Sequence, residues 1–342
     1  MSLADRFSAD VRAHVDARLD RFLLDAQSYA RAEAPGALAL VDQIRALTMR
    51  GGKRVRAVLI AAGVECVAPW SQHAGAVADL GAAMEILQSY LLIHDDWMDG
   101  DTLRRGGPTV HVALAQRLGS KDHGAWTAVL AGDLASAYAQ QLVASCDVRD
   151  DRRAAVNAAF AEMQRDVVLG QTLDVLGSGE IERIHRLKTS SYTVRGPLRL
   201  GHALAGGSSG VLEAFESFGP AAGVAFQLRD DLLGAFGNAR ETGKSSSSDL
   251  RSGKHTAPVT HAIEHLAPDS RAEFETLLGI DDDAAVARAR VLMDSVDARG
   301  AVEMRIAELC VRAEAALDGR GLRDAGREIL GQMLAAMAQR DR

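Results

Sequence analysis

The sequence predicts an all-α fold, because apolar residues recur at helical spacing along most of the chain and strand-like alternation is hard to find. Aromatic residues make up only 4% of the 342 residues and alanine is frequent, a composition that suits closely packed helices better than sheets. No stretch has the composition of a linker between domains. We therefore expect a single domain over residues 1–342.

The expected helices follow one another along the chain. Near the N-terminus, Phe7, Val11 and Val15 repeat every four residues, as on the apolar face of an amphipathic helix. A long buried helix is expected at Ala74–His94, where apolar residues recur every three or four positions. Further helices are expected at Trp126–Ala144, Ala154–Leu176, Leu212–Phe236, Ala301–Ala316 and around Ile329–Met337.

Two polar segments and the prolines interrupt this pattern. Gly100–Thr109 is rich in glycine, and Gly237–Gly253 contains a run of four serines. A polar segment as long as the second one, inside a compact domain, is either disordered or a lid over a working site. The seven prolines are expected mainly at helix ends or in loops, including Pro108, Pro197 and Pro220.

The composition narrows the function. Lys and Arg number 39 against 46 Asp and Glu, and this net charge of −7 disfavours a nucleic-acid binder. The three cysteines lie too far apart for a zinc cluster or a disulfide framework. No segment approaches the roughly 20 apolar residues of a transmembrane helix. The N-terminal segment mixes acids and bases and does not resemble a signal peptide, so we expect a cytoplasmic protein.

The clearest chemistry lies in an acidic motif at the end of the helix expected at Ala74–His94. Asp95 and Asp99 are four residues apart, so their carboxylates share one helix face. At the negative end of the helix dipole they repel each other unless a cation lies between them. Magnesium suits such donors, because it takes one or two carboxylates and completes its shell with phosphate oxygens and water. The alternative is a solvated acidic helix end, but Arg104 and Arg105 follow closely and favour shared phosphate oxygens.

A second acidic motif and a basic cluster strengthen this interpretation. Asp230 and Asp231 again end an apolar helix before a polar loop, which supplies Lys244 and Lys254. Two acid-ended helices with basic loops indicate a cavity closed from both sides. The cluster Gly51-Gly52-Lys53-Arg54-Val55-Arg56 opens a helix, where Lys53 and Arg56 are expected on one face at the positive end of the dipole, a position suited to anions.

Seven ordered motifs give the chain a close resemblance to the all-trans polyprenyl diphosphate synthases, from about Gly51 to the C-terminus. They are G-G-K-R-x-R at 51–56, D-D-x-x-D with R-R-G-x-P-T at 95–109, G-D at 132–133, G-Q-x-x-D at 170–174, K-T at 188–189, F-Q-x-x-D-D at 226–231, and the G-K pairs at 243–244 and 253–254. The resemblance implies an all-helical isoprenoid-synthase bundle around a central cavity and a homodimer. It also implies a prenyltransferase that joins isopentenyl diphosphate to an allylic diphosphate.

The resemblance assigns roles to individual residues. Three Mg²⁺ ions are expected, held by Asp95, Asp99 and Asp230. The residues expected to grip the allylic diphosphate are Arg104, Lys188 and Lys244, and those for isopentenyl diphosphate are Lys53, Arg56 and Arg105, with Gln88 where many relatives have histidine. Lys254, in the second G-K pair, is also expected to bind substrate. Facing the allylic cation would be Thr189, Gln227 and the carbonyl of Lys188, while Gln171 and Asp174 would line the cavity.

Two positions bear on activity and product length. Position 234 is glycine where relatives often have a third acid, and we expect that an aspartate there would change the rate little. The growing chain is expected to run along the helix before Asp95, so Tyr90 and Leu91 would form the floor. Relatives with a bulky aromatic residue at the position of Tyr90 stop at fifteen or twenty carbons. We therefore expect a short-chain product, with geranylgeranyl diphosphate favoured over farnesyl diphosphate.

Two other functions remain open on the sequence. A class I terpene cyclase shares the helical cavity and the first acidic motif, but it lacks an isopentenyl site, which Lys53 and Arg56 would form here. A non-catalytic subunit of a heteromeric synthase usually loses the first acidic motif, and that motif is intact in this chain.

Overall fold

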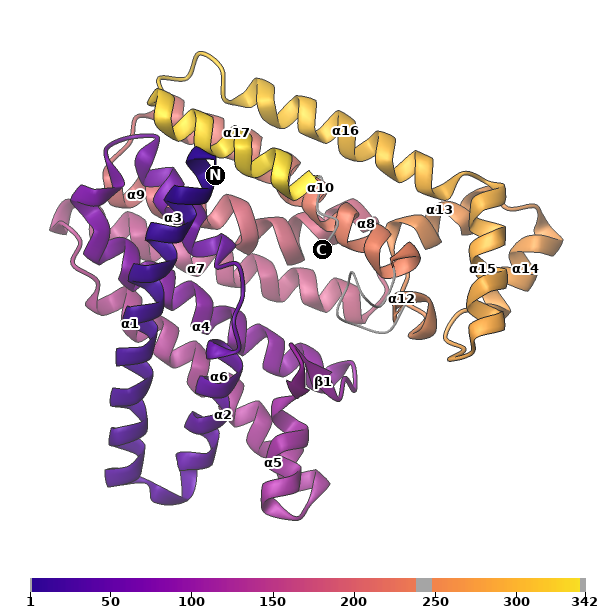
Figure 1. Ribbon diagram of the computed structural model, residues 1–342, viewed down its shortest axis with the longest axis horizontal. Helices are drawn as coiled ribbons and strands as arrows, with labels where there is room; N and C mark the ends of the chain where they lie inside the picture. The colour runs from indigo at the N-terminus through magenta and orange to yellow at the C-terminus, as the bar shows by residue number, and fades with distance from the viewer. Residues whose placement is uncertain (1, 238–247, 339–342) are drawn as a thin grey trace. The chain divides into compact units, whose positions relative to one another are not determined.

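The computed structural model describes residues 2–237 and 248–338. The described residues are almost entirely helical, so the prediction of an all-α fold is confirmed (Figure 1). Contacts within the chain separate two compact units. Unit 1 comprises Met1–Phe160, Pro197–Gly207 and Arg323–Gly326; unit 2 comprises Ala161–Gly196, Ser208–Leu322 and Arg327–Arg342.

Unit 1 is built around one central helix, α4 (Ala74–Met98), which packs against α6 (Lys121–Ser145), α1 (Leu3–Glu33) and α3 (Val55–Glu65). Apolar residues on nearly all sides of α4 are buried, as expected for a helix in a core. The span Trp70–Met98 is long and apolar enough to cross a membrane, but 72% of its apolar window is buried inside the protein, so it packs as a core helix. The other elements of unit 1 are η1 (Pro35–Ala37), α2 (Leu38–Met49), η2 (Trp70–His73), β1 (Leu103–Arg104), β2 (Gly107–Pro108) and α5 (Val110–Leu118).

The two strands of unit 1 lie in Gly100–Thr109, one of the two polar segments that interrupt the helical pattern of the sequence. They form an antiparallel hairpin in which Leu103 pairs with Pro108 and Arg104 with Gly107. The chain reverses through Arg105 (φ 51°) and Gly106 (φ 73°). Positive φ at both central residues is the conformation of a type I′ hairpin turn, in which glycine is favoured at the second position.

Unit 2 centres on α10 (Ser209–Phe236), which packs against α16 (Ala298–Ala316) and against a π-helix, η3 (His185–Arg195). Pro220 lies inside α10, so the prediction that it marks a helix end or a loop is wrong. The remaining elements of unit 2 are α8 (Ile181–Ile184), α12 (Ser248–Arg251), α13 (Ala257–His265), α14 (Pro268–Leu277) and α15 (Asp283–Ser295). Three helices pass from one unit to the other, namely α7 (Asp150–Val175), α9 (Gly196–Ala205) and α17 (Asp324–Ala338).

Candidate active site

The first acidic motif closes α4 in unit 1. Asp95 is half-buried in the last turn of the helix, and Asp99 is the exposed C-cap residue. The backbone N–H of Asp99 donates to the carbonyl of Asp95 at 2.8 Å, which extends the helical geometry through residue 99. The two carboxylates therefore lie one turn apart on the same face, as their spacing predicts.

The middle acid of this motif has a different environment. Asp96 is 0% exposed, and its Oδ1 accepts a hydrogen bond from Nε of Arg104 at 2.7 Å. Arg104 also donates to Asp101 at 2.9 Å. Because Arg104 lies on β1, this pair ties the hairpin to the end of α4. Burial raises the pKa of Asp96, and the Arg104 guanidinium opposes that shift. Asp96 is thus a structural acid. The guanidinium of Arg104 is bonded to the carboxylates of Asp96 and Asp101, and its contact with a diphosphate stays a prediction.

The segment Gly51–Arg54, the basic loop before α3, has a geometry that the sequence did not predict. The helix begins at Val55, immediately after Arg54, which has a left-handed φ of 51°. Lys53 therefore precedes the helix, and the prediction that Lys53 and Arg56 share one helical face is wrong. A non-glycine residue in this region costs of order 1–3 kcal/mol, so the surroundings of Arg54 must hold it there.

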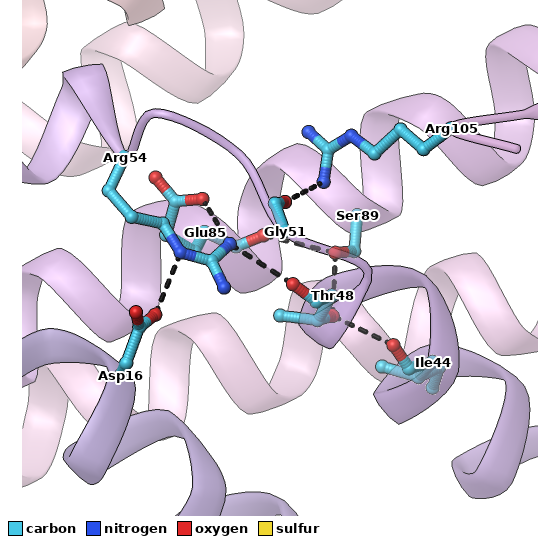
Figure 2. Close-up of polar contacts among 8 residues, drawn as sticks. All are labelled: Asp16, Ile44, Thr48, Gly51, Arg54, Glu85, Ser89 and Arg105. Carbon is cyan, nitrogen blue, oxygen red and sulfur yellow. Dashed lines mark hydrogen bonds and ion pairs between the residues drawn. The ribbon is translucent and has the colours of Figure 1, made fainter. Parts of the chain in front are cut away.

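Arg105 lies against this same loop. Nη1 of Arg105 donates to the carbonyl of Gly51 at 2.9 Å (Figure 2). A Cβ on Gly52 would lie 3.8 Å from both Nη1 and Nη2 of Arg105, so the guanidinium lies beside this glycine. Unit 1 thus brings the G-G-K-R-x-R segment and the R-R-G hairpin together, although they are about 50 residues apart in the sequence.

Three further predicted residues lie along α4. Gln88, Tyr90 and Leu91 are each half-buried. The Tyr90 ring meets His94 edge-on, with centroids 5.0 Å apart, and Nε2 of His94 bonds to the carbonyl of Val129 on α6 at 3.0 Å. His94 is therefore a packing residue between α4 and α6. The roles of Gln88 in substrate binding and of Tyr90 and Leu91 in product length stay predictions.

In unit 2, Lys188 and Thr189 lie on the π-helix, which no periodicity in the sequence revealed. A π-helix is rare and is often found at functional sites. Gly170 on α7 faces its backbone: a Cβ there would lie 2.6 Å from the carbonyl carbon of Leu187 and closer still to the nitrogen of Lys188. The glycine of the G-Q-x-x-D motif therefore permits α7 to pack directly on the backbone that bears Lys188.

Thr189 belongs to a buried chain of hydrogen bonds. Its Oγ1 donates to Oε1 of Gln227 at 2.7 Å, and Nε2 of Gln227 donates to Oδ1 of Asp231 at 2.9 Å. Oδ2 of Asp231 accepts from the backbone N–H of Ala257 at 3.0 Å and lies 3.3 Å from Nε2 of His185. These partners, led by His185, outweigh the effect of burial and lower the pKa of Asp231. Asp231 and His185 were not among the predicted site residues.

The other predicted residues of unit 2 lie on α7, on the π-helix, on α10 and after α12. Nζ of Lys188 lies 2.5 Å from Oδ2 of Asp174, so the K-T and G-Q-x-x-D motifs are in direct contact. Gln171 is half-buried one turn before Asp174. Asp230 is half-buried on α10, next to the buried Asp231. Lys254 is exposed after α12, and its N–H donates to the carbonyl of Asp249 at 2.9 Å. Lys244 and most of the polar segment Gly237–Gly253 lie outside the described residues.

The space beside Gly234 is filled by the side chain of another residue. A Cβ on Gly234 would collide with the carboxylate of Asp249, which comes from α12. Asp249 therefore places a carboxylate where the third acid of the second motif would begin. The expectation that an aspartate at 234 would change the rate little stays a prediction, but the structure favours a larger effect, because that side chain would meet the carboxylate of Asp249.

The donors available suit magnesium that is shared with a substrate. Within the described residues, no group of three or more histidine, cysteine or carboxylate side chains is arranged to hold a metal ion. Asp95 and Asp99 are hard oxygen donors one turn apart, at the end of α4, where Asp95 is half-buried and Asp99 is exposed. Such a pair fits Mg²⁺, which accepts one or two carboxylates and takes its remaining oxygens from phosphates and water.

Comparison with known proteins places the chain in a family. Residues 39–296 match the family described as Polyprenyl synthetase. The chain is 30% identical over 254 residues to a short chain isoprenyl diphosphate synthase of Methanothermobacter thermautotrophicus, covering 71% of this chain and 73% of the relative. It is 30% identical over 289 residues to the geranylfarnesyl diphosphate synthase of Aeropyrum pernix, covering 81% of this chain and 85% of the relative.

A solved structure supports the same assignment. The geranylgeranyl pyrophosphate synthase of Corynebacterium glutamicum, complexed with isoprenyl diphosphate and magnesium, is 31% identical, with a TM-score of 0.89 over 99% of this chain and 100% of that one. Relatives in both comparisons are named as synthases of prenyl diphosphates. The chain therefore belongs to the polyprenyl synthetase family and is a prenyltransferase.

Proposed function

We propose that the protein condenses isopentenyl diphosphate with an allylic diphosphate, head to tail and with magnesium, to form a short all-trans prenyl diphosphate. The observation that carries this proposal is the pair of carboxylates, Asp95 and Asp99, one turn apart at the end of α4. Names of relatives support the reaction class, and the magnesium in the Corynebacterium glutamicum structure supports the metal.

The reaction begins with ionisation of the allylic substrate. Its C1–O bond breaks, which leaves an allylic carbocation and a diphosphate anion. Asp95, Asp99 and Asp230 would hold Mg²⁺, expected to number three ions, whose positive charge would stabilise the departing diphosphate. Lys188, Lys244 and Arg104 would add cationic donors to the same anion, and Lys254 would extend this set.

The carbocation is then captured by the second substrate. The double bond of isopentenyl diphosphate attacks C1 of the cation, and the new tertiary cation loses a proton to the departing diphosphate, which restores a double bond. The oxygens of Thr189 and Gln227 and the carbonyl of Lys188 are weak acceptors suited to an allylic cation, because none is a strong nucleophile. Gln171 and Asp174 would line the cavity, and a dry cavity prevents quenching by water.

The second diphosphate requires its own cations, and these favour a synthase over a terpene cyclase. Lys53, Arg56 and Arg105 would bind isopentenyl diphosphate, with Gln88 beside them on α4. The hydrogen bond from Arg105 to the carbonyl of Gly51 supports a common site for these residues. The intact Asp95 and Asp99 likewise argue against a non-catalytic subunit.

For the product, we propose geranylgeranyl diphosphate, with farnesyl diphosphate as the alternative. The support is the half-buried Tyr90 five positions before Asp95, with Leu91 beside it, since a bulky ring there would limit chain growth. We further propose a single domain over residues 1–342, a cytoplasmic location and a homodimer. Trp126 and Leu130, one turn apart on α6 and 61% and 56% exposed, are candidates for a subunit interface.

The test is to incubate the purified chain with dimethylallyl and isopentenyl diphosphates, with Mg²⁺ or with EDTA, and to identify products by mass spectrometry. We expect elongated prenyl diphosphates with Mg²⁺ and none with EDTA. Cyclised hydrocarbons from longer allylic substrates would instead indicate a cyclase. No turnover of any allylic substrate would indicate a non-catalytic subunit.

A further inference from the structure

Arg54 is a buried cation held at three points. Its side chain is 3% exposed, and its left-handed backbone connects Lys53 to the start of α3. Nε donates to Asp16 on α1 at 2.9 Å, while Nη1 donates to the carbonyl of Thr48 on α2 at 3.0 Å and to Oε2 of Glu85 on α4 at 2.9 Å (Figure 2). Of the two carboxylates, Asp16 is 48% exposed, so Glu85 is the counter-ion inside the protein.

Glu85 is a charged residue inside the apolar helix α4. Its side chain is 3% exposed, and its Oε1 is buried with no hydrogen-bond partner among the described residues. Burying a carboxylate is costly unless it is paired. The tie to Arg54 therefore fixes both side chains, because removing either would leave a buried charge uncompensated.

The network around Glu85 also joins α2 to α4 below the basic loop. The Ser89 hydroxyl donates to the carbonyl of Glu85 at 3.0 Å and lies 2.7 Å from Oγ1 of Thr48. Thr48 in turn donates to the carbonyl of Ile44 at 2.7 Å (Figure 2). Both anchors of Nη1 of Arg54, the Glu85 carboxylate and the Thr48 carbonyl, are thus held in one rigid arrangement.

The cations above this network repel one another. Desolvation, followed by the charges of Arg54, Arg56 and Arg104, lowers the pKa of Arg105, and Glu85 acts in the opposite direction. The buried carboxylate of Glu85 thus stabilises the charge of Arg54, in the loop before α3, and of Arg105, in the hairpin. Without it, less of the repulsion among these cations would be compensated.

We propose that Glu85, through its buried ion pair with Arg54, is a positioning residue for the isopentenyl diphosphate site. It holds Arg54 in the left-handed conformation and thereby fixes where Lys53 and Arg56 lie on either side of it. This inference rests on the proposed function, because it assumes that these cations bind isopentenyl diphosphate.

The sign of one kinetic change separates positioning from a simple charge effect. In Glu85→Gln, loss of a negative charge near an anion site would by itself tighten binding of the anion. If Glu85 positions the loop, the same variant weakens binding of the anion. We expect the KM for isopentenyl diphosphate to rise at least about tenfold, while kcat and the KM for the allylic substrate stay within about twofold.

Two variants complete the design. Glu85→Asp keeps the charge at a shorter reach, so it should fold and recover part of the lost affinity. Asp79→Asn is the matched control, because the Arg18–Asp79 ion pair, at 2.5 Å, also joins α1 to α4 and is formed by two residues that lie outside the loop before α3. It should lower the melting temperature and leave both KM values unchanged.

The outcomes are distinct. If the wild-type chain performs no condensation, the proposed function fails and this inference fails with it. If it does condense, an unchanged or lower KM for isopentenyl diphosphate in Glu85→Gln overturns positioning alone. A parallel rise in both KM values also overturns it, since that indicates a general loss of structure. Should Glu85→Gln not fold, wild-type KM values in Glu85→Asp overturn it as well.

Discussion

The hydroxyl of Thr189 donates to Oε1 of Gln227 at 2.7 Å, and this direction is set by Asp231 one turn further along α10. An ionised carboxylate can only accept, so Asp231 must receive the NH₂ group of Gln227. The amide oxygen then faces Thr189, which must donate its proton. The lone pairs of the Thr189 oxygen can then act as acceptors, in keeping with its proposed place beside the allylic carbocation.

The first prediction removes the acid that sets this direction. Asparagine at Asp231 has one acceptor oxygen instead of two, so it cannot serve both Gln227 and the N–H of Ala257. We expect Asp231→Asn to lower kcat about tenfold to a hundredfold (~1.4–2.7 kcal/mol) and to reduce the melting temperature. Steady-state kinetics and thermal unfolding check this, and wild-type values for both would contradict the assigned direction.

The second prediction concerns the contact between α7 and the π-helix. Gly170→Ala places a methyl group 2.6 Å from the carbonyl carbon of Leu187, and overpacking of this kind costs roughly 1–3 kcal/mol. We expect a lower melting temperature and a lower kcat. Gly331→Ala on α17 is the matched control, because no atom of the described residues lies within 4 Å of the position of its Cβ and alanine favours a helix. Equal effects of the two substitutions would show that the contact is unimportant.

Much of the fold could be predicted from the sequence, because each long helix carries its own apolar repeat. The helix expected at Ala74–His94 is α4, and the one expected at Leu212–Phe236 lies within α10. The placement of Asp95 and Asp99 on one helix face could also be predicted, because it depends only on their spacing of four residues. The π-helix and the bond between Thr189 and Gln227 were not, because they arise from contacts between segments that the chain separates by 38 residues.

The buried acids were also hard to identify. Asp95 and Asp96 are adjacent in the sequence, and the structure distinguishes them by the complete burial of Asp96 and by its bond to Arg104 on β1. Glu85 did leave a signal, as a charged residue in an otherwise apolar helix. A buried acid of that kind must have a cationic partner, but nothing in the sequence identifies Arg54 as that partner.

The third prediction tests the carboxylate of Asp249 above Gly234. Gly234→Asp would bring two carboxylates together at one place, so we expect activity to fall about tenfold or more (~1.4 kcal/mol). In the double variant Gly234→Asp with Asp249→Gly, a single carboxylate remains there, and activity should recover to within a few-fold of wild type. A double variant less active than either single one would rule out this exchange.

The fourth prediction concerns product length. Tyr90→Ala removes a half-buried ring that contacts His94, and it should open the floor of the cavity and shift products to twenty-five carbons or more. Tyr90→Phe keeps the ring and should keep the product. Mass spectrometry of the products decides the matter, and an unchanged distribution from an active Tyr90→Ala enzyme would place the limit elsewhere.

The central claim is that adjacent acids at the end of α4 divide their work, with Asp95 acting on the substrate through magnesium and Asp96 holding the hairpin. The most direct test compares turnover and unfolding free energy in Asp95→Asn and Asp96→Asn. Asp95→Asn should lose at least about a thousandfold in turnover (~4 kcal/mol) with unchanged stability, while Asp96→Asn should lose about 3–5 kcal/mol of stability, as expected when one partner of a buried ion pair is removed. An Asp95→Asn enzyme with near wild-type turnover, or an Asp96→Asn protein as stable as wild type, would contradict this division.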